Sequence, residues 1–220
     1  MGQAKSKNPY TGESSVDVSS PPSSSLFKGG ILDIGCNKNN ILACCSEDKS
    51  ICLFDWEECI RNYSKMKRTY LHGHERAVNA ICLRNQKLFS VSRDLTIRIW
   101  DLNSHSLSST LKNAHELNVV DVTVTQDEKR FVTGSRDYSV KLWDTESLSL
   151  MKTYSSPRNV VTCVSFGPDE ALFYQGSEDL TVRVFDSRSS SREPVKQLVG
   201  YTYFPISIDI HCNGNYLATG

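Results

Sequence analysis

Histidine, aspartate and a hydroxyl residue occur together twice in this chain of 220 residues. The two sets are His74, Ser90 and Asp94, and His115, Thr133 and Asp137. Such residues could form a hydrolase triad, in which a base activates a hydroxyl nucleophile. However, an active site is usually built once, and neither hydroxyl lies in a Gly-x-Ser-x-Gly turn. We therefore expect no catalytic residue, no enzyme activity and no cofactor.

The segments that carry these residues alternate apolar and polar positions, and Asp, Gly and Ser interrupt them. Such alternation is typical of short β-strands joined by tight turns. In four segments an aspartate stands six residues before an aromatic residue, and each aromatic residue is followed by a second aspartate. The pairs are Asp48 and Phe54, Asp94 and Trp100, Asp137 and Trp143, and Asp179 and Phe185. The closing aspartates Asp55, Asp101, Asp144 and Asp186 are 46, 43 and 42 residues apart. The spacing within each segment is constant, whereas the spacing between segments varies. This predicts rigid hairpins joined by loops of variable length.

A Gly-His opening and a Trp-Asp end within a unit of about 40–45 residues resemble the WD-repeat family. Gly73-His74 and Trp100-Asp101 carry both marks, and the resemblance covers roughly residues 29–220. It implies an all-β fold, a β-propeller. The Ser-, Pro- and Lys-bearing composition of residues 1–28 predicts a disordered tail before it. The expected blades are 29–56, 72–101, 111–144 and 154–186, with a partial fifth at 198–220. Because the family commonly closes at seven blades, we expect this chain to be a truncated or shortened form.

The resemblance also implies that two blades contain a buried hydrogen-bonded tetrad. Its members are His74, Ser90, Asp94 and Trp100 in one blade, and His115, Thr133, Asp137 and Trp143 in the next. A buried imidazole, carboxylate, hydroxyl and indole N–H can satisfy one another and fix the turn. The first unit has no opening His. In the fourth unit Ser156, Gln175 and Phe185 replace His, hydroxyl and Trp, so we expect weaker bracing there.

Members of this family bind partners with loops on the narrow face of the propeller. By motif position, the residues expected to point outward there are Glu47, Arg93, Arg136 and Glu178, together with Ala77, Asn79, Asn118, Val120, Asn159 and Val161. Arg93 and Arg136 would lie on adjacent blades, flanked by Asn79 and Asn118. Such a pair could bind an acidic peptide or a phosphorylated loop. The alternative is a rim that is merely solvated.

The N-terminus matches the N-myristoylation pattern, with Gly2 as the acceptor and Ser6 four residues later. One myristoyl chain gives only weak, reversible membrane contact, and the alternative is an unmodified tail. The Met-Gly start and the Ser-x-Arg-Asn-Val-Val-Thr opening at 156–162 resemble a small ciliary subgroup of the family. That resemblance implies a scaffold for membrane and cargo trafficking near the base of cilia.

A second interpretation is based on Phe185-Asp-Ser-Arg188, which resembles the W-D-x-R box of cullin-RING substrate receptors. It implies a ubiquitin-ligase receptor that binds its adaptor through Arg188. A G-protein β-like subunit is a weaker alternative, because residues 1–28 show no heptads. In each case the expected partners are other proteins rather than a small-molecule substrate.

Composition excludes several other classes of function. The 25 basic and 25 acidic residues balance, so we expect no nucleic acid partner. No signal peptide or bilayer-spanning run is visible, which predicts a cytoplasmic protein. The eight cysteines form no C-x-x-C motif, so we expect buried thiols and no metal site.

Overall fold

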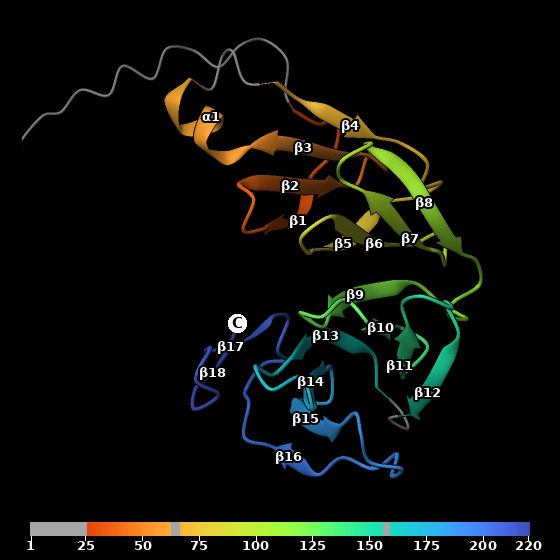
Figure 1. Ribbon diagram of the computed structural model, residues 1–220. Helices are drawn as coiled ribbons and strands as arrows, with labels where there is room; N and C mark the ends of the chain where they lie inside the picture. Colours follow the sequence, from red (N-terminus) through yellow and green to blue (C-terminus); the bar gives the residue numbers. More distant parts are fainter. Residues whose placement is uncertain (1–25, 63–66, 156–158) are drawn as a thin grey trace, which may run out of the picture.

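The computed structural model describes residues 26–62, 67–155 and 159–220, and this part of the chain is all-β except for one short helix. The described strands form four four-stranded sheets and one two-stranded hairpin. Figure 1 shows the sheets side by side along an open arc, each one rotated relative to the last. Within each sheet the strands follow chain order and run antiparallel. These are propeller blades, and we number the four sheets as blades 1 to 4.

The strand bounds of the blades are as follows. Blade 1 contains β1 (Ile31–Cys36), β2 (Ile41–Ser46), β3 (Ile51–Asp55) and β4 (Thr69–Leu71). Blade 2 contains β5 (Val78–Leu83), β6 (Lys87–Ser92), β7 (Ile97–Asp101) and β8 (Ser106–Leu111). Blade 3 contains β9 (Val119–Val124), β10 (Arg130–Ser135), β11 (Ser139–Asp144) and β12 (Leu150–Ser155). Blade 4 contains β13 (Val161–Phe166), β14 (Leu172–Ser177), β15 (Thr181–Asp186) and β16 (Lys196–Leu198), and the hairpin is β17 (Ile208–Ile210) with β18 (Leu217–Thr219).

The hydrophobic core lies between neighbouring blades, because the sheet faces that meet there carry apolar side chains. One cluster joins blades 1 and 2, a second joins blades 2 and 3, and a third joins blades 3 and 4. At the second seam the rings of Phe89 and Phe131 lie 5.5 Å apart, and both side chains are fully buried. Full burial of such a side chain contributes about 1.5–3 kcal/mol. Each blade is therefore stabilised mainly by its neighbours.

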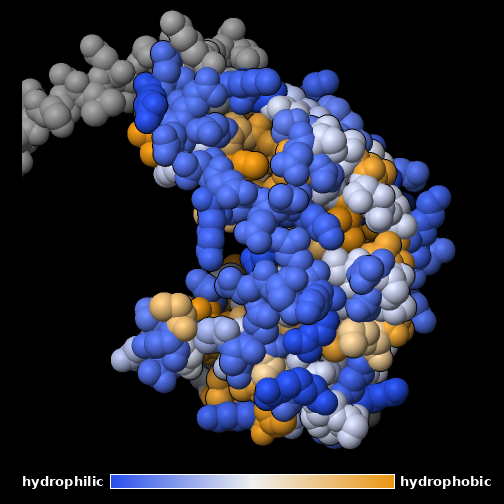
Figure 2. Space-filling view, viewed as in Figure 1, coloured by the Kyte–Doolittle hydropathy of each residue, from blue (hydrophilic) through white to orange (hydrophobic). Residues whose placement is uncertain are grey.

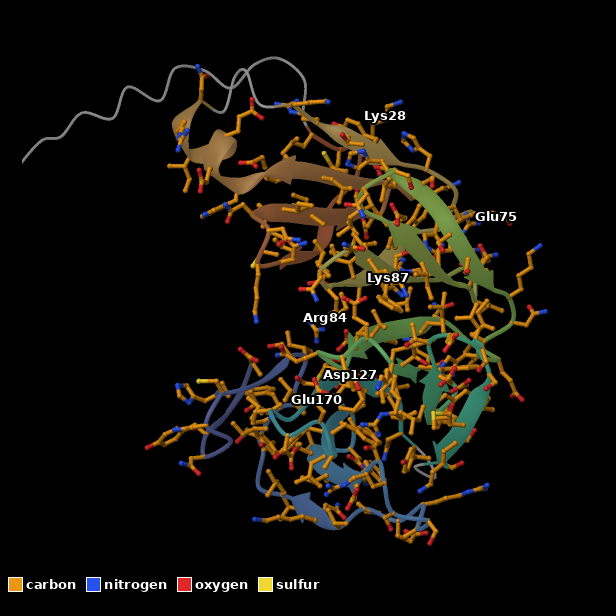
Figure 3. The ribbon with its side chains drawn as sticks, viewed as in Figure 1. Lys28, Glu75, Arg84, Lys87, Asp127 and Glu170 are labelled. Carbon is orange, nitrogen blue, oxygen red and sulfur yellow. The ribbon has the colours of Figure 1, made fainter. Side chains whose placement is uncertain are left out.

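Polar side chains also tie the blades together, at the end of the sheets opposite the narrow face (Figure 3). Arg84 of blade 2 donates from Nε to the carbonyl oxygen of Val124 in blade 3, over 3.0 Å. The Glu170 carboxylate of blade 4 accepts a hydrogen bond from the backbone N–H of Gln126, beside Asp127 of blade 3. These bonds give a protein partner to backbone groups at the ends of the strands, where water would otherwise be the partner.

Between the third and fourth strands of blade 1 lies the one described helix. Helix α1 (Trp56–Arg61) follows β3 directly and precedes β4, the outer strand of blade 1. The Asp55 carboxylate caps the helix by accepting from the Glu58 N–H over 2.8 Å. An acidic first turn and Arg61 in the last turn complement the helix dipole. Within the described residues, no helix is long and apolar enough to cross a membrane.

The disordered tail predicted for residues 1–28 is wrong at its C-terminal end. Residues 1–25, which include Gly2, lie outside the described residues. Phe27, however, is only 7% exposed and packs against Cys52 and Phe54 of blade 1. The Tyr70 hydroxyl fixes the same segment by donating to the Leu26 carbonyl oxygen over 2.9 Å. Blade 1 therefore begins earlier than residue 29.

The cysteines with described side chains form no disulfide. Cys45, Cys52 and Cys163 are buried in the blades, whereas Cys36 and Cys212 are exposed. Burial raises the pKa of the Cys163 thiol to about 12 and also raises the pKa of Cys45 and Cys52. Because the thiolate is the reactive form, the buried thiols are poor nucleophiles.

Candidate interaction surface

The same tight turn joins the second and third strands of every blade. In blade 3, Ser135 Oγ accepts from the Asp137 N–H over 3.1 Å, and Asp137 Oδ1 accepts from the N–H and hydroxyl of Ser139 at 3.0 and 2.5 Å. The residue after each turn aspartate has a left-handed backbone: Lys49 (φ 76°), Leu95 (67°), Tyr138 (67°) and Leu180 (64°). An aspartate carboxylate stabilises such a turn by accepting a hydrogen bond from the backbone N–H two residues later. The local sequence therefore fixes where the residue before each aspartate points.

In blades 2 and 3 the turn aspartate begins a hydrogen-bonded chain through the blade. His74 donates from Nδ1 to Asp94 Oδ2 over 2.8 Å, and its Nε2 lies 2.8 Å from Ser90 Oγ. Trp100 Nε1 donates to the same hydroxyl over 2.8 Å. In blade 3, His115, Asp137, Thr133 and Trp143 repeat these contacts at 2.9, 2.8 and 2.9 Å.

In blade 3 the electrostatics indicate a neutral imidazole beside an ionised carboxylate, and in blade 2 the turn carboxylate is likewise ionised. Burial raises the pKa of Asp94 and Asp137, but hydrogen bonds from the histidines and turn hydroxyls outweigh it and hold both below their ordinary value. Burial lowers the pKa of His115 despite the nearby Asp137 carboxylate. Ser90 and Thr133 are fully buried and bonded on both sides. The hydroxyls therefore brace the turns and cannot reach a substrate.

Blade 1 has apolar residues at the other tetrad positions beside its turn carboxylate. The Lys28 N–H donates to Asp48 Oδ2 over 2.7 Å, as the residue after each histidine does in blades 2 and 3 at 2.9 and 3.0 Å. Phe27 consequently occupies the position of the histidine. It packs with Cys44 and Phe54, which stand at the positions of the hydroxyl residue and the tryptophan. The sequence pattern missed Phe27 because no histidine marked it.

Blade 4 replaces the histidine bond with an ion pair inside the sheet. The Arg183 guanidinium donates to Asp179 Oδ2, and the Thr181 hydroxyl donates to Asp179 Oδ1 over 2.6 Å. Phe185 stacks against Phe173 at 5.1 Å in place of an indole. Ser156, expected at the histidine position, lies outside the described residues. Blade 4 therefore satisfies its carboxylate through a guanidinium that sequence reasoning did not assign.

On the narrow face, Arg93 is held in place by Asn79. Arg93 Nε donates to Asn79 Oδ1 over 3.1 Å, and Asn79 Nδ2 donates to the Val119 carbonyl oxygen over 2.6 Å. Asn79 therefore positions Arg93 and also connects blade 2 to blade 3. Within the described chain, neither the Nη groups of Arg93 nor the Arg136 side chain has a hydrogen-bond partner. Both arginines are exposed, so their guanidinium groups can meet a ligand.

Four of the five residues predicted to contact partners lie around one hollow of about 370 Å³. It is lined by Leu32, Asn79, Arg93, Asn118, Val120 and Arg136. Arg188 lies elsewhere, past the end of β15 that is farthest from the narrow face, with its side chain 67% exposed. Ala77 and Val161 were expected to point outward but are buried, and Val161 packs into the core between blades 3 and 4.

The rim of the narrow face carries opposite charges on different blades. Glu47 and Glu178 are exposed at the turns of blades 1 and 4, while Arg93 and Arg136 occupy the same turn position in blades 2 and 3. Among the described side chains, no three His, Cys, Asp or Glu residues gather where they could hold a metal ion. The arrangement is suited to binding charged groups of another molecule.

Comparison with known proteins supports this architecture. The family described as "WD domain, G-beta repeat" matches residues 64–101, 106–144 and 148–186. Nuclear distribution protein nudF of Aspergillus niger is 30% identical over 141 residues, which is 62% of this chain and 30% of nudF. A WD repeat-containing protein 55 homolog of Drosophila ananassae is 33% identical over 86 residues, or 39% of this chain and 16% of that protein. WD repeat, SAM and U-box domain-containing protein 1 of Danio rerio is 30% identical over 106 residues, or 46% of this chain and 21% of that protein.

The chain spans less than a third of the length of each of these relatives. Each matched repeat combines the outer strand of one blade with the three inner strands of the next, as β8 is followed by β9, β10 and β11. The three repeats together cover more than half of the residues. This chain therefore belongs to the WD-repeat family, whose members generally act as protein-interaction scaffolds.

Proposed function

We propose that this protein is a non-enzymatic scaffold whose narrow face binds an acidic or phosphorylated segment of a partner protein. The supporting observation is the hollow of about 370 Å³ that carries Arg93 and Arg136 from adjacent blades. Guanidinium groups bind carboxylate and phosphate through paired, charge-assisted hydrogen bonds. Asn79 accepts from the Nε of Arg93 and leaves the two Nη groups available to such a ligand.

The charges around the hollow narrow the choice of ligand. Arg93 and Arg136 lie between the exposed carboxylates of Glu47 and Glu178 on the flanking blades. A uniformly acidic segment would meet repulsion at both glutamates, whereas one anionic group flanked by lysine or arginine complements the whole row. Charge complementarity of this kind contributes to specificity and association rate. We infer that the preferred segment has an anionic centre and basic flanks.

Binding to immobilised peptide libraries tests this proposal. One library contains a central phosphoserine with basic flanks, and its partner contains unmodified serine. We expect retention of the 220-residue chain by the phosphoserine library only. Because a hydrogen bond to a charged group contributes about 1.5–3 kcal/mol, Arg93→Ala or Arg136→Ala should weaken binding by about tenfold or more.

Lys129→Ala is the matched control, because Lys129 is an exposed cation at the opposite end of the strand that leads to Arg136. Equal binding of both libraries, or equal losses in the arginine variants and the control, would refute an anion site on this face.

We further propose that the scaffold works in the cytoplasm, in contact with membranes near the ciliary base. The support is the acceptor pattern at Gly2 and a sequence resemblance to WD repeat-containing protein thirty-one. A single myristoyl chain gives weak contact, so a partner on the narrow face would make attachment stable. Gly2→Ala should shift the protein from membranes to the soluble fraction. Unchanged distribution of Gly2→Ala in fractionated cells would refute the lipid tether.

A second candidate function is a substrate receptor of a cullin-RING ubiquitin ligase. It is favoured by the exposure of Arg188, whose Nε lies 3.5 Å from Asp186 Oδ1. Arg188 follows the end of β15 that lies opposite Arg93 and Arg136. One molecule could then hold an adaptor at Arg188 and a substrate on the narrow face. Arg188→Ala should abolish adaptor pull-down and leave peptide binding unchanged. If adaptor is never captured by the unaltered chain, this candidate fails.

A further inference from the structure

The loop between β15 and β16 contains three consecutive serines between two arginines, in the order Arg188, Ser189, Ser190, Ser191 and Arg192. Ser190, Ser191 and both arginines are exposed. Ser187, just before the loop, is buried and holds Arg130 of blade 3 through its hydroxyl. The loop is thus anchored at its start and accessible along its serines.

A lysine from the neighbouring blade reaches this loop. Lys152, on the outer strand β12, donates from Nζ to the Ser189 carbonyl oxygen over 2.8 Å and to the Ser191 carbonyl oxygen. Its ammonium also lies 4.5 Å from the ring of Tyr154. Burial, and then the charge of Arg192, lower the pKa of Lys152, and only Asp186 opposes them. Lys152 therefore brings a positive charge to the main chain of Ser191.

We propose that Ser191 is a phosphorylation site for an arginine-directed serine kinase, and that Lys152 and Arg192 bind the phosphate. Arg188 stands three residues before Ser191, where kinases with acidic substrate grooves recognise a positive charge. The assignment goes beyond partner binding on the narrow face and does not depend on it.

The transfer requires Mg²⁺–ATP as co-reactant. Ser191 Oγ attacks the γ-phosphorus and a new O–P bond forms, while the bond between the β,γ-bridging oxygen and the γ-phosphorus breaks and ADP leaves. The hydroxyl proton passes to the catalytic aspartate of the kinase. In the unmodified loop Ser191 Oγ accepts from the Glu193 N–H over 3.1 Å and keeps its own proton available.

The phosphate would bring a charge of about −1.5 to −2 to a loop that Lys152 contacts and that carries Arg192 next to Ser191. Lys152 already touches the main chain of Ser191, so a phosphate on this residue lies within reach of the ammonium. New bonds from Lys152 and Arg192 would fasten the outer edge of blade 4 to blade 3. Phosphorylation should therefore order the loop.

The first test is phosphorylation of the full chain by an arginine-directed kinase with Mg²⁺–ATP, followed by mass spectrometric mapping. We expect phosphate on Ser191, its loss in Ser191→Ala, and at least a tenfold slower reaction in Arg188→Ala. Ser190→Ala is the matched control, and its reaction should proceed at the parent rate. Absence of phosphate from Ser191, or full incorporation at Ser191 in Arg188→Ala, overturns the proposal.

The second test measures amide hydrogen exchange in residues 187–195 before and after phosphorylation. We expect exchange to slow about tenfold in the phosphorylated chain. Lys152→Met keeps an apolar stem over Tyr154 but removes the ammonium, so most of this protection should disappear. Equal protection in the parent chain and in Lys152→Met, or no protection in the parent, refutes the role of Lys152 as phosphate ligand.

Discussion

Every blade has an aspartate in the turn between its second and third strands, but the partners of this aspartate differ. Blades 2 and 3 share one arrangement, and blades 1 and 4 each have another. In blades 2 and 3 it bonds to a buried imidazole, at 2.8 and 2.9 Å. In blade 1 the imidazole is replaced by Phe27, and the carboxylate of Asp48 is held by main-chain and hydroxyl donors. In blade 4 the guanidinium of Arg183 takes that role. The carboxylate is the constant element of the turn, and its partner is interchangeable.

The carboxylates of the two histidine blades are buried more deeply than that of blade 4. The side chains of Asp94 and Asp137 are 5% and 7% exposed, whereas that of Asp179 is 17% exposed. A buried charge depends on its partners because water cannot replace them. The histidine blades should therefore be more sensitive to damage at this turn than the other two.

The largest effect is expected when the turn carboxylate is removed from a histidine blade. Asp137→Ala leaves the buried His115 without its partner and removes two bonds to Ser139. The free energy of unfolding should fall by about 3 kcal/mol. Asp48→Ala, in the blade without a histidine, should cost about 1 kcal/mol. Urea denaturation of both variants measures the difference.

Asp127→Ala is a suitable control, because this exposed carboxylate lies in a turn at the other end of blade 3. Losses of equal size in Asp137→Ala and Asp48→Ala would show that the imidazole adds nothing to the turn.

The blades themselves were predictable because the Ser-x-Asp turn and the aromatic residue six positions later are marks of local sequence. The outer strands were harder to predict. β8 (Ser106–Leu111) is largely exposed and mostly serine and threonine, so it shows little alternation. β4 has only three residues, and a helix precedes it. Edge strands obtain their pairing from the sheet they join, and their own sequences carry little signal.

The places of Arg93 and Arg136 were predictable for the same reason, since each residue directly precedes the turn aspartate of its blade. The connection through Asn79 was not, because it bonds to Val119, 40 residues away. Phe27 and Arg183 were also missed, since each replaces a histidine by a different kind of contact. Sequence marks reveal where a turn lies, and only packing reveals how its charge is satisfied.

Asp121, on the inner strand β9, differs from the turn aspartates in the direction of its pKa shift. Burial raises the pKa of Asp121 to about 7 although it accepts from the Val164 N–H at 2.7 Å. The folded state therefore keeps a proton that the unfolded state releases, and stability is lost as pH rises from about 4 through 7. Asp121→Asn cannot ionise, so relative to the parent it should gain about 2.5 kcal/mol between pH 5 and 8.

Urea denaturation of Asp121→Asn and the parent at pH 5 and pH 8 gives this difference directly, because other titrating groups cancel. Asp127→Asn is the control. Hydrogen bonds from the Thr125 hydroxyl and the Lys129 N–H lower the pKa of Asp127, so the effect of this substitution is confined to pH below about 4. An Asp121→Asn gap that stays constant from pH 5 to 8 would mean that Asp121 remains ionised.

The smallest effect is expected at the far end of the tetrad. Trp143→Phe removes the Nε1 donor to Thr133 Oγ1 but leaves the bond from that hydroxyl to His115 Nε2 at 2.8 Å. The result resembles blade 4, where Phe185 stacks without a polar partner. We expect a loss of about 1 kcal/mol, the usual net contribution of one hydrogen bond. Trp56→Phe, on the exposed face of α1, should change the urea midpoint by much less, because that side chain is 47% exposed. If both substitutions shift the midpoint equally, the indole bond does not support the blade, and the tetrad ends at the hydroxyl.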